Sequence, residues 1–250
     1  MELILIFIIG LCIGSFLNVC IYRIANGESI VFPSSHCMKC GIEIKKRDLI
    51  PVISYVLLKG KCRNCGDKIS IRYPLIELTN GILYILLYLS VGFSLELFKG
   101  CIFISLLLVI AFIDFDTHEV YRSTTIFGMI VGIVFLVLNY TLEGLLPWNN
   151  IVGALIGYGI IWLIVILTKG MGEGDIDIAM ICGLFLGIKG IILNLFLAFI
   201  IGGIVATILL ILRKMGRKSE MAFGPYLAVG GIITLLYGSY IMEMYFRFFL

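Results

Sequence analysis

The sequence predicts an all-α polytopic membrane protein, with about eight transmembrane helices and a small cytoplasmic domain between the first two spans. Of its 250 residues, 61% are hydrophobic and 14% are charged, and the mean hydropathy is +1.12. Soluble domains carry about 25% charged residues, so this composition excludes an ordinary soluble protein. Apolar runs of about 18–20 residues, long enough to cross a bilayer, recur along the chain.

The apolar runs predict the individual spans in order. They cover about 3–22, 74–92, 100–114, 124–140, 150–168, 176–189, 191–212 and 225–246. The sixth is short, and its boundary with the seventh lies near Gly190. The first follows Glu2 rather than a basic segment and lacks a small-residue cleavage site, so we expect it to stay as a helix. In the fifth, Gly153, Gly157 and Gly159 predict close helix packing.

The distribution of positive charge predicts the orientation. If the first span reaches the cytoplasm near Arg23, sixteen of the nineteen Lys and Arg residues fall in cytoplasmic connections, leaving Lys99, Lys189 and Arg247 outside. Cytoplasmic loops are enriched in these residues. We therefore expect a multi-pass protein of the cell membrane with both termini outside. Two acidic segments, 114–122 and 169–177, then share the cytoplasmic face.

The one long polar stretch predicts three domains: a first span at 1–22, a cytoplasmic domain at 23–73 and a membrane domain at 74–250. The stretch is basic, with ten Lys and Arg residues against four Asp and Glu. No aromatic stacking pattern or recognition helix accompanies this charge, so we expect contact with membrane lipids and no nucleic-acid binding. A stretch this short cannot bury enough apolar surface to fold without a staple.

Two cysteine pairs, each followed by glycine, predict that staple. They read HCMKCG, with Cys37 and Cys40, and GKCRNCG, with Cys62 and Cys65. This spacing lets four thiolates hold one tetrahedral zinc ion, and a reducing cytoplasm argues against disulfides. We interpret the cysteines as a zinc site; redox dithiols or a metal-free knuckle are the alternatives.

Acidic residues at the edges of spans predict chemistry, because carboxylates there are costly. Asp114 ends the run CIFISLLLVIAFID, and Asp175 follows GMGEG. Two carboxylates held close in a partly dry site share one proton, so one can activate water while the other donates to a carbonyl. The pair therefore predicts peptide hydrolysis without a covalent intermediate. Solvated helix-end acids are the alternative, which we favour for Asp116 and Asp177.

The glycines beside Asp175 predict how a substrate reaches it. With no side chains at Gly172 and Gly174, an extended peptide backbone can approach the carboxyl group closely. A flexible loop is the alternative interpretation.

Four segments in this order resemble the type 4 prepilin leader peptidases, GxGD aspartyl peptidases that are also N-methyltransferases. They are GSFLNVCIYR, the region from HCMKCG to RYPLIELTNG, GEGD and FGPYLA, and the resemblance covers nearly the whole chain. It implies that Asp114 and Asp175 form an aspartyl dyad at the cytoplasmic face and that the four cysteines bind zinc.

The resemblance also implies substrates and a second activity. Prepilins and pseudopilins would be cleaved after a glycine, and S-adenosylmethionine would methylate the new N-terminal amine. No Gly-x-Gly-x-x-Gly segment after a strand marks the methyl-donor pocket. Glu77 is a candidate to hold the amine, with pairing to Arg72 as the alternative. Gly60 is a candidate to shape that site, with turn geometry as the alternative.

The segment after Asp114 departs from the family pattern D-x-D-H-x-x-(I/L)-P-D. Here it reads DFDTHEVYR, so the histidine is shifted to His118, and Tyr121 and Arg122 replace proline and aspartate. We expect His118 to be a loop residue rather than a general base. Arg122 is either a topological anchor or a residue that tunes the dyad.

Two other functions compete with this interpretation. A GxGD protease without methylation is disfavoured by the cysteine pairs, which those relatives lack. A proton-coupled transporter would place its acids near the bilayer midplane and contain inverted repeats, whereas these acids cluster at one face.

Overall fold

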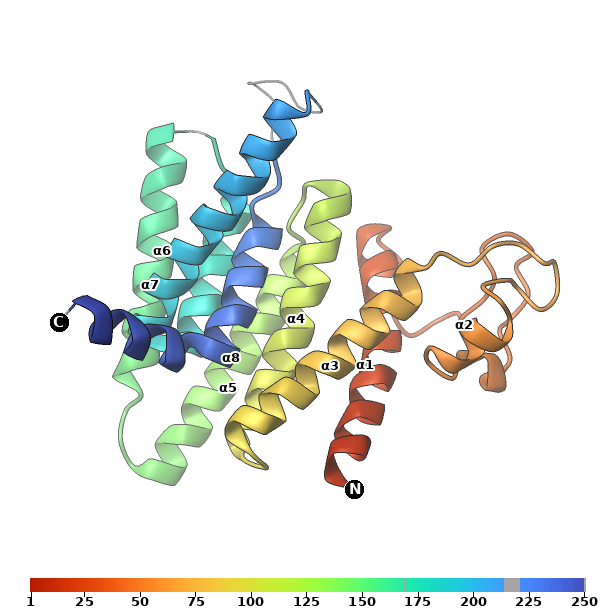
Figure 1. Cartoon of the computed structure of the whole chain (residues 1–250), viewed down its shortest axis with the longest axis horizontal. Coiled ribbons are helices and arrows are strands. Elements are labelled where there is room, and N and C mark those ends of the chain that lie inside the picture. The colour runs from red at the N-terminus through yellow and green to blue at the C-terminus, as the bar shows by residue number, and fades with distance from the viewer. Residues whose placement is uncertain (169, 214–220, 250) are drawn as a thin grey trace. The chain divides into compact units, whose positions relative to one another are not determined.

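The computed structural model describes residues 1–168, 170–213 and 221–249, which form eight α-helices and one short 3₁₀-helix, with no β-strand (Figure 1). Seven helices are long and apolar enough to cross a membrane, and the predicted all-helical membrane fold is confirmed. The chain divides into two compact units, Met1–Val109 and Ile110–Leu250. Four cations of the predicted cytoplasmic set lie outside the described residues: Lys169, Lys214, Arg217 and Lys218.

In the first unit, a loop-rich segment connects α1 (Glu2–Ala25) to α3 (Arg72–Val91) along the chain. This segment contains the 3₁₀-helix η1 (Lys46–Leu49) and α2 (Ile53–Leu57). Two glycines on one face of α1 let α3 approach to backbone contact. A Cβ added at Gly10 would lie 2.7 Å from Gly81 Cα, and one at Gly14 would lie 2.7 Å from Glu77 Cα. Small residues one helical turn apart favour this close packing in membranes.

The second unit contains α5 (Arg122–Glu143), α6 (Trp148–Thr168), α7 (Glu173–Ile211) and α8 (Gly224–Phe249), and α4 (Leu95–Thr117) ends within it. Every helix of this unit contributes apolar residues to its buried core, and the outward faces of the helices are exposed. Ile161, Ile178, Ile191 and Leu227 are fully buried. Long apolar helices are the expected architecture here, because hydrocarbon offers no partner to an open backbone.

The helix α7 reverses direction at Gly187, where φ is 73° and ψ is −175°. A Cβ at Gly157 of α6 would lie 2.3 Å from Ala179 O and 3.1 Å from Ile191 Cγ1. In a straight helix Ala179 and Ile191 would be about 18 Å apart, so the two arms of α7 must fold back on each other (Figure 1). The sequence predicted about eight spans with this boundary near Gly190. Among the described residues, seven helices are long and apolar enough to span, because α7 holds the predicted sixth and seventh spans as its two arms, and the break lies at Gly187.

Two asparagines at the start of α6 bind the backbone groups that the reversal releases. Asn149 Oδ1 accepts a hydrogen bond from the Ile188 amide at 3.2 Å, and Asn150 Nδ2 donates to Leu184 O at 2.9 Å. Gly153 packs directly against Gly187, where an added Cβ would lie 2.6 Å from the carbonyl carbon. The packing predicted for Gly153 and Gly157 is therefore present.

The packing predicted for Gly159 is wrong. Among the residues described, no atom lies within 4 Å of a Cβ placed there. Gly159 lies two residues after Gly157, which turns it about 200° around the helix and away from α7.

Candidate functional site

The carboxyl groups of Asp114 and Asp175 lie together in the second unit, at the end of α4 and in the first turn of α7. Their residues are only 4% and 5% exposed, although each lies within a few residues of a helix end. They are near enough that the charge of Asp114 acts on Asp175. The two acids that the sequence predicts as a dyad thus lie in the same part of the second unit, and the sharing of one proton between them stays a prediction.

Asp175 is held in place by the turn that starts its own helix. The Gly172 amide donates a hydrogen bond to Asp175 Oδ2 at 3.2 Å, and the Asp175 amide donates to Gly172 O at 3.1 Å. A carboxylate at the third position of a helix often binds back to the N-cap in this way.

Asp114 is placed against the start of α8. Its carboxyl group accepts a hydrogen bond from the Gly224 amide. A Cβ at Gly224 would lie only 2.5 Å from Asp114 Oδ2 and 3.0 Å from Ile178 Cδ1. Asp114 Oδ2 is buried and has no hydrogen-bond partner among the described residues. A buried acceptor that lacks a hydrogen-bond partner is suited to bind a water molecule or a substrate group.

The role of Gly224 was missed by sequence reasoning. FGPYLA was identified as a segment that opens the last span, but no contact was assigned to its glycine. The available signal was a glycine followed by proline at the first turn of an apolar helix, where proline is tolerated and the glycine amide is left without a helical partner.

The two glycines of GEGD lie in different surroundings. Among the described residues, a Cβ at Gly172 would meet a single atom within 4 Å, Asp175 Oδ2 at 3.7 Å, so no described side chain covers this side of the carboxyl group. A Cβ at Gly174 would lie 2.4 Å from Val120 Cβ, which fills the space. Substrate contact stays a prediction for both, and Gly174 also lets the loop after α4 approach the start of α7.

The residues that depart from the family pattern lie at the ends of helices. His118 follows α4 with φ 55°, and its amide donates to Asp114 O at 2.9 Å. Its side chain is exposed and lies near enough to Asp114 to interact with it electrostatically. Tyr121 precedes the first turn of α5, and Arg122 opens that helix as an exposed residue.

The four cysteines meet in the first unit. Their sulfur atoms all lie within 4.8 Å of one another, and Cys37 Sγ lies 3.8 Å from Cys65 Sγ. Four sulfurs at about 2.3 Å from one tetrahedral zinc would be about 3.8 Å apart, so this donor set fits the ion.

The two cysteine knuckles repeat one backbone design. In each, the first cysteine amide donates to the carbonyl five residues later, Cys37 to Ile42 at 3.0 Å and Cys62 to Asp67 at 2.8 Å. The glycine after each pair has a positive φ, 68° at Gly41 and 71° at Gly66, which other residues adopt at a cost. An ion pair of 2.8 Å between Lys39 and Asp67 joins the knuckles.

Backbone amides lower the pKa of two of the thiols. The Cys40 amide, followed by that of Lys39, lowers the pKa of Cys37, and the Ile42 amide lowers the pKa of Cys40. The Asp67 amide favours the thiolate of Cys65, but partial desolvation and the three other sulfur groups together raise its pKa to about 11. Crowded thiols that cannot all ionise without a cation are typical of metal centres.

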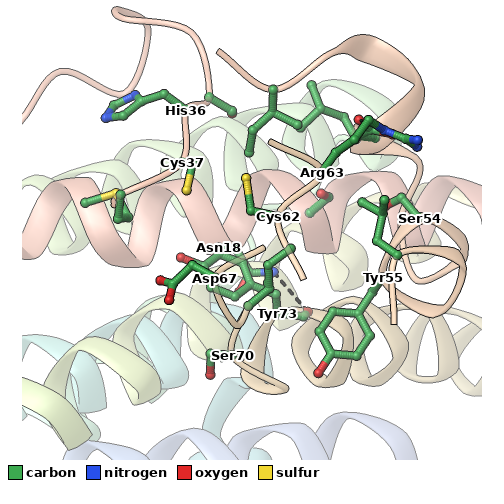
Figure 2. Close-up of a pocket in the computed structure, with 18 of the residues that line it drawn as sticks. Asn18, His36, Cys37, Ser54, Tyr55, Cys62, Arg63, Asp67, Ser70 and Tyr73 are labelled. Carbon is green, nitrogen blue, oxygen red and sulfur yellow. Dashed lines mark hydrogen bonds and ion pairs between the residues drawn. The ribbon is translucent and has the colours of Figure 1, made fainter. Parts of the chain in front are cut away.

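A cavity of about 570 Å³ lies between this cysteine centre and the paired helices α1 and α3 (Figure 2). Tyr55, Tyr73 and Glu77 are among its lining residues. Its size falls within the roughly 300–1,000 Å³ of small-molecule sites.

Glu77 is a buried carboxylate of this cavity, 7% exposed. It accepts a hydrogen bond of 2.7 Å from the Val52 amide and another from the Ser15 hydroxyl. Val52 has φ 61°, which is rare for a β-branched residue and costs about 1–3 kcal/mol. The sequence suggested Glu77 but neither partner, because both contacts join residues far apart in the chain.

Gly60 supports the wall of the same cavity. Its φ is 66°, and a Cβ there would lie 2.9 Å from Tyr55 Oη and 3.0 Å from Tyr55 Cζ. The glycine therefore meets both a backbone and a steric requirement, and its part in ligand binding stays a prediction.

The fold and these sites together define a class: polytopic membrane proteins that carry a buried pair of carboxyl groups and a separate four-cysteine centre. Comparison with known proteins then gives the family. Residues 8–91 match the Bacterial Peptidase A24 N-terminal domain, and residues 101–207 match the Type IV leader peptidase family.

The chain is also similar to curated proteins named prepilin leader peptidase/N-methyltransferase. It is 35% identical to the one from Neisseria gonorrhoeae, over 90% of this chain and 87% of that protein. It is 32% identical to the one from Bacillus subtilis (strain 168), over 97% of each. No solved structure matches significantly. The chain belongs to the prepilin leader peptidase/N-methyltransferase family, as its motifs predicted.

Proposed function

We propose that this protein removes the leader peptides of prepilins and pseudopilins and then methylates the new N-terminal amine. The observation that carries the proposal is the buried pair Asp114 and Asp175, in a chain whose relatives bear the name of both activities. One carboxylate takes a proton from a water molecule, and the other, protonated, donates a hydrogen bond to the scissile carbonyl. Cleavage follows a glycine of the substrate, as in the family that the motifs resemble.

The substrate reaches the dyad from the open side of Asp175. Gly172 presents no side chain there. Asp114 Oδ2, which has no hydrogen-bond partner among the described residues, supplies a site for the water or the carbonyl. The peptide must be extended at this point, because a helix hides its own carbonyl groups.

Methylation belongs to the cavity of the first unit. S-adenosylmethionine supplies a methyl group activated by a positive sulfonium centre, and aromatic rings and carboxylates attract cations. Tyr55, Tyr73 and Glu77 offer both groups inside one cavity of suitable size. Glu77 binds the substrate amine, and Gly60 keeps Tyr55 in position.

Zinc holds the two cysteine knuckles together. Cys37, Cys40, Cys62 and Cys65 are its ligands, supported by the spacing of their sulfur atoms. The ion has a structural role, because four protein ligands leave no open coordination position.

The orientation follows from charge. We place the loops rich in Lys and Arg and both candidate sites at the cytoplasmic face of the cell membrane. The two chain termini then lie on the outside. The protein contacts membrane lipids along its exposed apolar helices, and nucleic acid is not a partner.

The test is co-expression with a prepilin, followed by mass spectrometry of the mature N-terminus. Asp114→Asn and Asp175→Asn should each slow cleavage by at least about 100-fold, because each removes an acid or a base. Asp116→Asn and Asp177→Asn are matched controls near the same helix ends and should cleave normally. Normal processing by either Asp114→Asn or Asp175→Asn would disprove the dyad. A native product without the mass of a methyl group would favour the protease without methylation.

A further inference from the structure

The short helix α2 has two faces of different character. Ser54, Tyr55 and Leu58 line the cavity of the first unit. On the other side, Ile53, Val56 and Leu57 are 56%, 65% and 74% exposed. Positions i, i+3 and i+4 share one face of a helix, so these three form a continuous apolar surface, here called the α2 face. Contiguous exposed apolar side chains in a polar domain mark a contact surface.

The depth of α2 relative to α1 indicates what covers the α2 face. Glu77 packs against Gly14, where an added Cβ would lie 2.7 Å from Glu77 Cα. Glu77 lies five residues, about 7.5 Å along the helix, after the start of α3 at Arg72, which corresponds to a shallow depth in the leaflet. The Val52 amide, at the start of α2, binds the Glu77 carboxylate at 2.7 Å. The start of α2 therefore lies within a side-chain length of the middle of α1.

Figure 1 agrees with this position of α2, because it shows α2 alongside α1 rather than beyond its end. The start of α3 also presents exposed apolar side chains. Ile71 is 63% exposed just before α3, and Leu75 is 52% exposed in its first turn.

Charged residues flank the α2 face in the sequence. Lys45, Lys46 and Arg47 precede it, and Lys59 and Lys61 follow it; all five are exposed. Long basic side chains reach from an apolar depth to the headgroups, where anionic lipids attract them. This pattern is typical of an interfacial helix with its apolar face 5–10 Å inside the boundary between headgroups and acyl chains.

We propose that the α2 face is a membrane-seated surface whose partner is the acyl-chain region of the leaflet that surrounds the Ala25 end of α1. The cavity behind α2 then opens at the level of the lipid headgroups rather than in free solution. This inference does not depend on either enzymatic activity.

The test is tryptophan fluorescence of the full chain in nanodiscs. The two native tryptophans, Trp148 and Trp162, are replaced by phenylalanine, and Leu57→Trp is introduced. In lipids with brominated acyl chains this variant should lose most of its fluorescence, while aqueous iodide should have little effect. Met38→Trp, at an exposed apolar position (59%) in the first cysteine knuckle, is the control and should respond to iodide instead.

Quenching of Leu57→Trp by iodide would overturn the proposal, because the face would then lie in water. Protection from both quenchers would also overturn it, because protein would then cover the face. If Leu57→Trp does not fold, Val56→Trp carries the same test from the same face.

Discussion

At the scale of single residues, Gly224 has no side chain, and this determines how closely α8 can approach Asp114. Gly224 brings its amide to the carboxyl group, and its Cα lies so close that no methyl group fits between them. The geometry of the dyad therefore depends on α8 as much as on the two helices that carry the acids.

We expect Gly224→Ala to slow cleavage by about 10- to 100-fold, because a displacement of about 1 Å near reacting groups can reduce the rate by this much. An added Cβ would lie 2.5 Å from Asp114 Oδ2 and would displace the carboxyl group. Single-turnover cleavage of a prepilin measures the effect. Gly203→Ala is the control, since a Cβ there meets no atom of the described residues within 4 Å. Equal rates for the two variants would contradict the contact.

The carboxylate of Glu77 gives a prediction in the other unit. Glu77→Gln keeps an acceptor for the Val52 amide but removes the negative charge that binds an amine or a sulfonium group. We expect methylation to fall by at least about 10-fold, the effect of losing about 1.4 kcal/mol, while cleavage continues. Mass spectrometry of the pilin N-terminus separates the two activities. Glu96→Gln, at the start of α4, should change neither, and full methylation by Glu77→Gln would refute the assignment.

At the scale of elements, the reversal of α7 depends on one backbone conformation. Gly187 has φ 73°, and a Cβ there would lie 2.4 Å from Asn149 Nδ2. Gly187→Ala should therefore destabilise the protein by at least about 1–2 kcal/mol through its left-handed conformation alone. The measurement is thermal unfolding in detergent, compared with Gly203→Ala, which lies in the second arm of the same helix. An unchanged unfolding temperature for Gly187→Ala would show that the reversal tolerates a side chain.

The elements themselves were largely readable from the sequence, because hydrocarbon imposes one length and one backbone geometry on every span. The predicted span 150–168 matches α6 within two residues, and the predicted spans 176–189 and 191–212 correspond to the two arms of α7. The reversal was placed at Gly190 rather than Gly187, since an apolar run that continues through both glycines gives no periodic signal. Asn149 and Asn150, which bind its backbone, lie in another part of the sequence.

The site was readable only in part. The acids and cysteines were found because charges and thiols in those patterns are rare and chemically specific. The contacts of Asp114 with Gly224 and of Glu77 with Ser15 and Val52 were not found. They join distant segments through backbone atoms, which leave no mark in the sequence.

At the scale of the whole molecule, the two candidate sites occupy separate compact units. The cysteines and Glu77 lie in Met1–Val109, and the two aspartates lie in Ile110–Leu250. A change confined to one unit should therefore leave the chemistry of the other in place.

Metal removal tests this separation. We expect a strong zinc chelator to release about one zinc per chain and to abolish methylation, while cleavage by the dyad persists. The physical reason is that a small metal-stapled domain loses its fold with its ion. Metal analysis of the purified protein, with Cys62→Ser as a variant that should contain less zinc, gives a readout apart from activity. Loss of cleavage in step with methylation would show that the units depend on each other.

The doubled-back α7 also bears on how the chain enters the bilayer during synthesis. Its first arm, from Glu173 to Leu186, is about 21 Å long, too short for a hydrocarbon layer of about 30 Å, and it carries Asp175 and Asp177 near one end. Released alone from the translocon, such a segment would partition poorly into lipid. The second arm supplies the missing hydrophobicity, so the ribosome must complete both before either can leave the translocon, and they enter the membrane as a helical hairpin.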